Sequence, residues 1–489
     1  MLTTFTAPAF AKTWYIENGD ITISAGKTEG TNKVSQGSTT DEEDTDTVIT
    51  NNNRDTASSH TVTIDAGNDK VEVTLKDVNI KADSGSALTS NGDVTLTLKG
   101  ENHLTGGNGD IYGGDGITSS GSLTISGGTV TATGGNNTGS DGSGGSGIYS
   151  VSGSVTISGG TVNATGGEGS KNNSTSGGSG IYSDSGDVTI SGGTVNANGG
   201  NGGTISGGDG ICSSGGVTIS SGSTVTANGG SGEDGSGGRG ITSNGGVTVS
   251  GGTVNAKGGS GKNGNGGDGI RSLDHVAISG GTVKSNGGSG NLSGGNGIIS
   301  YDIDLSGSLE LTAKAGSPNG KALSRAGKEL DLNTIKDKLG PGAKVTVTDA
   351  NGKVNQVSIP RPVEPEEPVI PEESSSSSDG GSATSSAPAS PFPGLTVTDK
   401  DGQRISYTST QSGNTLTVCV GRFTASFRIS LATLRQLRAE GIDTITFQTI
   451  LCSTTLSVDE LLAMGGEDTE VVLTHHIRSS TLTVGGKAV

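Results

Sequence analysis

The sequence predicts an all-β protein, a right-handed parallel β-helix (solenoid) of three sheets with capping elements, followed by a disordered linker and a small C-terminal α+β domain. The first observation behind this prediction is composition: 90 of the 489 residues are glycine and only 3% are aromatic. Such a composition without a period indicates disorder, whereas a fixed period indicates a solenoid whose repeats bury their apolar faces against one another. The second observation is that the period exists.

One motif recurs between about residues 85 and 319. It reads G-x-G-I-x-S, then V-T-I-S-G-G, then T-V-x-A-x-G-G, and it ends in a variable glycine-rich loop. Copies begin 28 to 33 residues apart, and the difference in length lies in the loop. The apolar residues that open the copies are Leu88, Ile117, Ile148, Ile181, Ile211, Ile241, Ile270 and Ile298. This spacing is typical of the coils of a β-helix.

Each copy divides into three short strands in which inward apolar and outward polar residues alternate. In the third copy, Ile148 and Ser150 are expected to point inward and Tyr149 outward. Glycine pairs separate the strands and supply the positive-φ corners that a coil needs. Strands this short cannot form a sheet within one copy. Each strand therefore pairs with the same strand of the next copy, about 4.8 Å away.

A serine lies two residues after each opening residue, on the same inward face. We expect either a buried ladder of hydroxyls that hydrogen-bond along the axis or small residues that fit a tight corner. The members of this column are Ser90, Ser119, Ser150, Ser183, Ser213, Ser243, Ser272 and Ser300.

The two ends of the solenoid are less regular. Residues 12–84 are predicted to form irregular first coils that cap the core, interrupted by an acidic loop at 41–44. Residues 320–360 are predicted to form the C-terminal cap. This cap is expected to hold a short helix at 333–339 and a hairpin that turns at Asn351-Gly352.

Residues 361–394 are rich in proline, glutamate and serine, which predicts an extended, disordered linker. Residues 395–489 are predicted to form the α+β domain, in which one helix begins after Ser430. A second helix begins at a capping box formed by Ser457 and Glu460.

Residues 1–11 are interpreted as the remnant of a signal peptide, because Ala9-Phe10-Ala11 fits the small-x-small cleavage pattern. Three cysteines form neither a disulfide framework nor a metal-ligand spacing. Buried free thiols are the preferred interpretation, and a Cys419–Cys452 pair is the alternative. The net charge of −18 argues against nucleic acid as a partner and against anionic membrane surfaces. No apolar run is long enough for membrane insertion.

Three segments of the repeat region resemble a known family: Gly114–Ser119 with the following Leu-Thr-Ile-Ser-Gly-Gly-Thr-Val, Gly267–Ile270, and Val94–Gly107. The family is the carbohydrate-binding β-helix family of clostridial and related gut-bacterial surface proteins. Its best-known members have a pectate-lyase-like fold, bind polygalacturonate and calcium, and lack lyase activity. The resemblance covers roughly residues 14–320. It implies a secreted or cell-surface protein of a Gram-positive bacterium.

Calcium is a cofactor that the resemblance implies, because the aspartate of the G-D-G-I motif is a plausible calcium ligand in that family. In this sequence the motif places Asp115, Asp209 and Asp268 in that position. Other copies carry serine, asparagine or Arg239 there, so the column cannot offer a continuous string of sites with six to eight oxygens each. For Asp209, Arg239 and Asp268 the alternative is an exposed ladder of ion pairs.

Glycan binding requires flat aromatic rings and planar amides. Tyr149 and Tyr182 occupy the same outward position in adjacent copies, about 4.8 Å apart. Asn163 and Asn196 belong to outward polar columns of the third strand. We therefore predict a carbohydrate-binding surface at these four residues. The alternative is that such ladders serve packing and solubility.

The predicted function is non-catalytic binding of a long polysaccharide. An acidic, pectin-like polymer is expected to need calcium as a bridge because of the net charge of −18. An adhesin-like surface structural protein is the first alternative. A lyase is the second, since Arg239 and Arg271 near the aspartates superficially fit one, but the paired carboxylates of a polygalacturonase are missing. Other components of the cell envelope are expected partners of residues 395–489.

Overall fold

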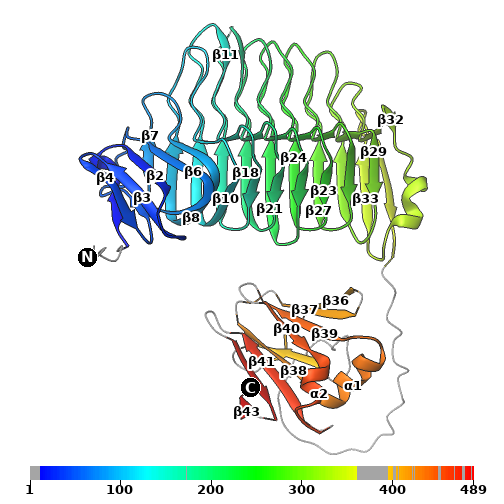
Figure 1. The fold of residues 1–489 in the computed structure, drawn as a ribbon. Helices are drawn as coiled ribbons and strands as arrows, with labels where there is room; N and C mark the ends of the chain where they lie inside the picture. Colours follow the sequence, from blue (N-terminus) through cyan, green and yellow to red (C-terminus); the bar gives the residue numbers. More distant parts are fainter. Residues whose placement is uncertain are drawn as a thin grey trace, which may run out of the picture. The chain divides into compact units, whose positions relative to one another are not determined.

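The computed structural model describes residues 11–360, apart from residue 172, and much of 395–489. In the second range it leaves out residues 400–402, 406, 413, 421, 423, 450–452, 467–468, 476–479, 486 and 489. The predicted linker 361–394, Cys452 and all but the last residue of the segment 1–11 lie outside the described residues. The chain forms two compact units, which divide within the predicted linker (Figure 1).

The first unit is a parallel β-solenoid of about 12 turns, which confirms the predicted fold class. Equivalent strands of successive coils pair in parallel and build three sheets. Sheet 1 contains the start of β6 (Val62–Lys76), the start of β8 (Leu88–Thr105), β9 (Ile117–Ser119), β12 (Ile148–Ser150), β16 (Ile181–Ser183), β19 (Ile211–Ser213), β22 (Ile241–Ser243), β25 (Ile270–Ser272), β28 (Ile298–Ser300) and β31 (Leu323–Arg325). The opening residues therefore stack within one sheet.

Sheets 2 and 3 follow the same rule, and the long strands β8 and β10 (Leu123–Thr133) run from one sheet into the next. Sheet 2 continues through β13 (Val155–Ile157), β17 (Val188–Ile190), β20 (Val217–Ile219), β23 (Val247–Val249), β26 (His275–Ile278) and β29 (Asp302–Leu305). Sheet 3 contains β7 (Asn79–Lys81), the ends of β8 and β10, β14 (Thr161–Thr165), β18 (Gly193–Asn198), β21 (Ser223–Asn228), β24 (Thr253–Lys257), β27 (Thr282–Asn286), β30 (Glu310–Lys314) and β33 (Lys344–Thr348).

The core is narrow and aliphatic, as the alternation predicts. In β12 the side chains of Ile148 and Ser150 are buried and Tyr149 is half-exposed. The same pattern repeats in β14, where Val162 and Ala164 are buried between exposed or half-exposed neighbours. Each coil adds one opening residue, two residues of sheet 2 and two of sheet 3 to a single apolar column. Small aliphatic side chains fill this column, which explains the low aromatic content.

The serine column is buried, and its hydrogen-bonded hydroxyls bind backbone carbonyls and not one another, whereas the Ser90 hydroxyl has no partner among the described residues. The Ser213 hydroxyl donates to the Gly186 carbonyl of the preceding coil (2.8 Å) and is 3.1 Å from the Gly216 carbonyl of its own coil. Ser243 makes the same pair of contacts with Gly215 and Gly246. The expected contact along the axis exists, but it runs from a hydroxyl to the corner of the coil before it.

Two backbone segments approach each other closely in every coil. The chain leaves sheet 3 through one glycine pair, makes a loop, and returns to sheet 1 through a second pair. The exit glycine Gly200 donates to the carbonyl of Gly178 (2.8 Å), and the return glycine Gly208 donates to the carbonyl of Gly200 (2.9 Å). The same bonds recur coil after coil from Gly107 to Gly316. A Cβ on Gly200 would lie 2.0 Å from the carbonyl oxygen of Gly167, so only glycine fits.

Beyond this crossing the loops stack on one another and form a second ridge along the solenoid, here called the crest (Figure 1). Strands β11 (Asp141–Ser143) and β15 (Ser174–Ser176) pair in parallel within it, and single bridges such as Gly232–Gly261 join later loops. The variable glycine-rich segments are therefore ordered parts of the repeat.

The N-terminal cap differs from the prediction in one respect. Strand β2 (Ile21–Ala25) pairs in parallel with β6, but β3 (Asn32–Gln36) and β4 (Thr39–Asp44) add to it in antiparallel fashion. The acidic segment 41–44 is therefore part of a strand and not a loop. Its last residue, Asp44, is buried and accepts hydrogen bonds from Trp14 Nε1 (2.7 Å) and from the backbone of Lys12 (3.1 Å). Strands β1 (Thr13–Tyr15) and β5 (Val48–Thr50) complete this end.

The C-terminal cap agrees with the prediction. A 3₁₀ helix, η2 (Leu332–Lys338), begins at Asp331, whose side chain accepts from the Asn333 amide. Strand β33 extends sheet 3, and β34 (Val354–Ser358) folds back on it in antiparallel pairing through the turn at Asn351-Gly352. These elements cover the open end of the apolar column.

The second unit is the predicted α+β domain. Strands β35 (Leu395–Thr398), β38 (Ala425–Ser430), β41 (Glu470–His475), β42 (Ser480–Val484) and β43 (Lys487–Ala488) form one sheet, and β36 (Thr408–Ser412), β37 (Thr415–Cys419), β39 (Thr444–Gln448) and β40 (Ser453–Ser457) form another. Helix α1 (Leu431–Ala439) is capped by the hydroxyl of Ser430, and α2 (Val458–Leu462) by that of Ser457. Both predicted helix starts are confirmed.

The glycine crossing generates a stability prediction. We expect Gly230→Ala to lower the free energy of unfolding by about 3 kcal/mol or more, because its Cβ would meet the Gly200 carbonyl oxygen at 1.9 Å in a packed site. Gly159→Ala is the control, since nothing lies within 4 Å of a Cβ at that corner. Thermal unfolding of both variants checks the prediction, and equal stabilities would contradict it.

Candidate functional site

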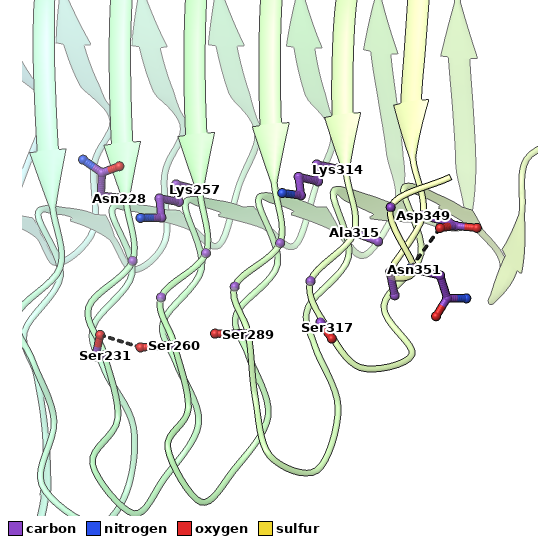
Figure 2. Close-up of a pocket in the computed structure, with 18 residues that line it drawn as sticks. Asn228, Ser231, Lys257, Ser260, Ser289, Lys314, Ala315, Ser317, Asp349 and Asn351 are labelled. Atoms are coloured by element: carbon purple, nitrogen blue, oxygen red, sulfur yellow. Dashed lines mark hydrogen bonds between the residues drawn. The ribbon is translucent and has the colours of Figure 1, made fainter. Parts of the chain in front are cut away.

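A groove runs along the solenoid where sheet 3 meets the crest, and it encloses about 910 Å³ (Figure 2). The end residues of the strands in sheet 3 form one wall, and the first residues of the crest loops form the other. The floor between them consists of the exit glycines. Because these glycines carry no side chain, the floor is bare backbone except at Ala315, which takes a glycine position in the last of these coils.

The two walls are rows of polar side chains in register. The first wall carries Asn228, Lys257 and Lys314. Their Cα positions are in register, and Asn286 of β27 fills the same row between the two lysines without lining the groove. The second wall carries Ser231, Ser260, Ser289 and Ser317. Figure 2 shows the serines as a line below the lysines, with the hydroxyls of Ser231 and Ser260 3.0 Å apart. The groove therefore offers a hydroxyl at each of four coils and an amide or ammonium group at three of them.

Both ends of the groove are defined. At one end the hairpin turn closes the groove with Asp349 and Asn351. The Asp349 carboxylate accepts a hydrogen bond from the backbone amide of Asn351 (2.9 Å). At the other end a shallower hollow of about 360 Å³ shares Ser231 and Ser260 with the groove and extends it along the crest to Glu168. The polar surface is longer than one sugar and is open to solvent along the axis.

The charge of this face differs from that of the whole chain. From Thr129 to Asn286, the outward positions of sheet 3 hold threonine, asparagine and lysine, and no carboxylate. The charged residues among them are Lys257 and Lys284. In a chain of net charge −18 this is a neutral to basic strip, which ends at Glu310 in β30. A ligand that carries carboxylates would therefore meet no like charge on β21, β24 and β27.

Two of the four predicted sugar-binding residues lie on this sheet. Asn163 in β14 and Asn196 in β18 are stacked in adjacent coils, and the Asn196 amide donates to Asn163 Oδ1 (2.8 Å). Asn198 and Asn228 repeat the arrangement at 2.9 Å. Each amide pair thus uses one donor and one acceptor internally, and the remaining amide groups face outward.

Tyr149 and Tyr182 lie on sheet 1, so the structure does not bring them together with the asparagine pair. Their rings stack on each other, with centroids 5.2 Å apart and planes inclined by 14°. The Tyr182 hydroxyl donates to Asp184 Oδ1 (2.5 Å), and burial together with this carboxylate raises the pKa of Tyr182. The facing ring surfaces are occupied by each other. A sugar can therefore reach the ring edges, since the outer faces lie toward Thr118 and Cys212, which continue the same column in the adjoining coils.

The three aspartates of the predicted calcium column lie in separate coils, and each supports the coil that follows it. One carboxylate oxygen accepts from the backbone amide of the equivalent residue in the next coil: Asp115 from Ser146 (2.6 Å), Asp209 from Arg239 (2.5 Å) and Asp268 from Asn296 (2.7 Å). Asn296 repeats the contact with the amide of Lys321 (3.0 Å). Burial raises the pKa of both Asp115 and Asp209.

Arginines complete this column. Arg239 lies 3.6 Å from Asp209, and Arg271 lies 3.9 Å from Asp268. Ion pairs therefore form, as the alternative interpretation expects, but the two aspartate side chains are largely buried and not exposed. Within the described ranges, no cluster of three or more histidine, cysteine, aspartate or glutamate side chains could hold a metal ion. Calcium at Asp115, Asp209 or Asp268 therefore stays a prediction from the resemblance.

The described cysteines, Cys212 and Cys419, are free. Burial raises the pKa of Cys212 to about 12, so its thiol stays protonated and is a poor nucleophile at neutral pH. Among the helices of the described residues, none combines the length and the apolarity that crossing a membrane requires.

The sequence matches no protein-family model, and neither the curated proteins nor the solved structures contain a significant match. The site is therefore defined by its own geometry.

Sequence reasoning missed the groove, although two signals for it are present. The serine that follows the exit glycines in G-G-S recurs in consecutive copies, and lysine replaces asparagine in the last outward position of two strands. Neither signal indicates a concave surface until the crossing of the two glycine segments is known.

The hydrogen bond between Asp115 and Ser146 generates a prediction that separates a structural role from calcium binding. Asp115→Asn keeps the acceptor oxygen without a buried charge, as Asn296 does naturally, so its Tm at neutral pH should equal or exceed that of the parent. Asp115→Ala leaves the Ser146 amide unpaired and should lower the free energy of unfolding by about 1–3 kcal/mol.

The pH dependence follows from the raised pKa of Asp115. A carboxyl whose pKa is higher in the folded than in the unfolded state lowers the free energy of unfolding as the pH rises from the unfolded-state pKa to the folded-state pKa. The advantage of Asp115→Asn should therefore be largest at neutral pH and vanish in acid. Thermal unfolding across this range measures it. A calcium-dependent rise in Tm that the parent shows and the asparagine variant lacks would instead support a metal at Asp115.

Proposed function

We propose that this chain is a non-catalytic carbohydrate-binding solenoid that holds a long polysaccharide along the groove between sheet 3 and the crest. The observation that carries the proposal is the register of the two walls, which repeat polar side chains and hydroxyls along successive coils over a floor of mostly bare backbone. The β-solenoid fold is compatible with this role. Secretion to a bacterial cell surface is part of the same proposal.

The physical argument rests on matched repetition. A polysaccharide presents hydroxyls at regular intervals, and the groove presents donors and acceptors about every 4.8 Å. Single contacts between exposed polar groups are weak, because each competes with water. Once one segment is bound, the next contacts form within the same complex at high effective concentration, so weak contacts add up along the polymer.

The lining of the groove supports binding without hydrolysis. Glycoside hydrolysis by the common mechanisms needs two carboxyl groups that flank the scissile bond. The single carboxylate of the groove proper is Asp349, and its Oδ1 already accepts from the amides of Asn351 and Lys353. The serines of the second wall have no histidine beside them in the groove, so the lining lacks the base that would activate a hydroxyl.

A bulky side chain placed in the groove tests the proposal. Ser260 is exposed at the centre of the second wall, and Ser260→Trp should fill the space above the glycine floor. We expect the affinity for any polysaccharide that the parent retains on a glycan array to fall by about tenfold or more, about 1.4 kcal/mol. Ser250→Trp is the matched control, since Ser250 is exposed at a corner of the same coil outside the groove. Unchanged binding by Ser260→Trp would place the site elsewhere.

The tyrosine pair on sheet 1 is a second candidate surface, favoured by the two stacked rings. If the groove is the site, the double variant Tyr149→Ala/Tyr182→Ala should bind glycan as tightly as the parent does. The Tm of this variant should fall slightly, because an aromatic stack contributes about 1 kcal/mol. Affinity electrophoresis of the parent and the double variant decides between the surfaces. Loss of binding with retained folding would assign the glycan to the tyrosines. A parent that binds no polysaccharide would favour an adhesin-like role.

A further inference from the structure

Two exposed lysines, Lys257 and Lys314, line the groove. Lys257 and Lys314 belong to one wall and are separated by Asn286 of the intervening coil, which places them two strand spacings apart, about 9.6 Å. Lys284 projects from the strand between them, at the neighbouring outward position. All three lysines are exposed. Figure 2 shows Lys257 and Lys314 on the same side of the groove, above the line of serines.

These lysines are not neutralised by neighbours. The ion pairs formed within the described part of the solenoid use other cations, including Arg239, Lys262 and Arg271, and none of them involves Lys257, Lys284 or Lys314. The outward positions of β24 and β27 contain no carboxylate, whereas β30 carries Glu310 at the opposite end of the strand from Lys314. Lys257 and Lys314 line the groove, and Lys284 lies on the strand between them. These ammonium groups create a local positive potential, since a concave surface focuses the field.

We propose that Lys257, Lys284 and Lys314 bind the anionic groups of an acidic polysaccharide directly, without a bridging cation. This inference rests on the proposed function and names the class of polymer that the groove takes. An ammonium group donates up to three charge-assisted hydrogen bonds to a carboxylate or sulfate. Asn286 between the two wall lysines offers only a neutral amide. The wall thus alternates charged and neutral positions.

The alternation fits carboxylates that recur along one edge of the polymer. A polymer in which acidic and neutral sugars alternate places no carboxylate on the opposite edge, where the serine wall carries no cation. In an extended chain consecutive sugars point in opposite directions, so equivalent groups recur at every second sugar. A copolymer of a uronic acid and an amino sugar therefore presents a carboxylate, then a neutral amide or hydroxyl, in the order in which the wall presents lysine and asparagine. The serine row on the opposite wall serves both kinds of sugar, because a hydroxyl donates and accepts.

Hyaluronan tests the inference because it has one carboxylate per disaccharide and can be converted to a neutral polymer of the same length by carboxyl reduction. In the presence of a chelator, the full chain should bind hyaluronan more tightly than it binds carboxyl-reduced hyaluronan. Added salt should reduce this difference in affinity. Lys257→Gln/Lys314→Gln should lower the affinity for hyaluronan by about tenfold, at roughly two- to fivefold for each exposed lysine. The same variant should bind the reduced polymer as the parent does.

The control is Lys328→Gln/Lys336→Gln, which removes the same charge from exposed positions in the C-terminal cap and should leave the affinity unchanged. The inference is overturned if hyaluronan and its reduced form bind equally, if binding requires calcium, or if the two double variants behave alike. It is also overturned if inorganic polyphosphate competes as well as free hyaluronan, since that indicates a patch that responds to charge alone.

Failure of the inference and failure of the proposed function give different results. If the parent retains neutral polysaccharides and Ser260→Trp abolishes this binding, the groove is a glycan site without a preference for acidic polymers. If neither form of hyaluronan nor any polysaccharide on the array binds, both proposals fall.

Discussion

Close approach of two backbone segments in every coil is the constraint on which the rest of this solenoid depends. Exit and return glycines cross without side chains, and each amide donates to a carbonyl of the other segment, so hydrogen bonds alternate between the two segments along the molecule. This crossing separates a narrow aliphatic column on one side from the crest on the other. A loop of any length can leave and re-enter at the crossing, which is why copies that differ by several residues still stack in register.

The same constraint creates the groove. Because the crossing admits no side chain, the junction between sheet 3 and the crest is hollow, and the residues just before and after the exit glycines become its walls. Those wall residues contribute nothing to the core, whose inward neighbours are small side chains: Ala227, Ala256 and Ser285 in three successive coils. Function and folding are thus assigned to alternate residues of the same strands.

Much of the fold could be predicted from the sequence because a solenoid converts chain period into spatial register. The opening column, the alternation in β12 and the hairpin at Asn351-Gly352 all follow from local pattern and repeat length. The strand conformation of the acidic segment that ends at Asp44 could not be predicted, since the buried Asp44 carboxylate accepts a hydrogen bond from Trp14, thirty residues earlier.

Less of the site could be predicted, since it depends on the contacts that outward side chains make with residues of the neighbouring coils. Register places Tyr149 beside Tyr182 but does not show that the rings occupy each other's faces. A G-D-G-I motif indicates an exposed carboxylate, whereas Asp115 instead holds the backbone of the next coil. The last outward position of sheet 3 changes along the axis from Thr165 through Asn198 and Asn228 to Lys257, Asn286 and Lys314. Replacing one outward side chain by another leaves the packing of the core intact, so these positions are free to vary independently of the fold. For the polymer proposed to bind along the groove, the row offers neutral hydrogen-bonding groups at one end and ammonium groups at the other.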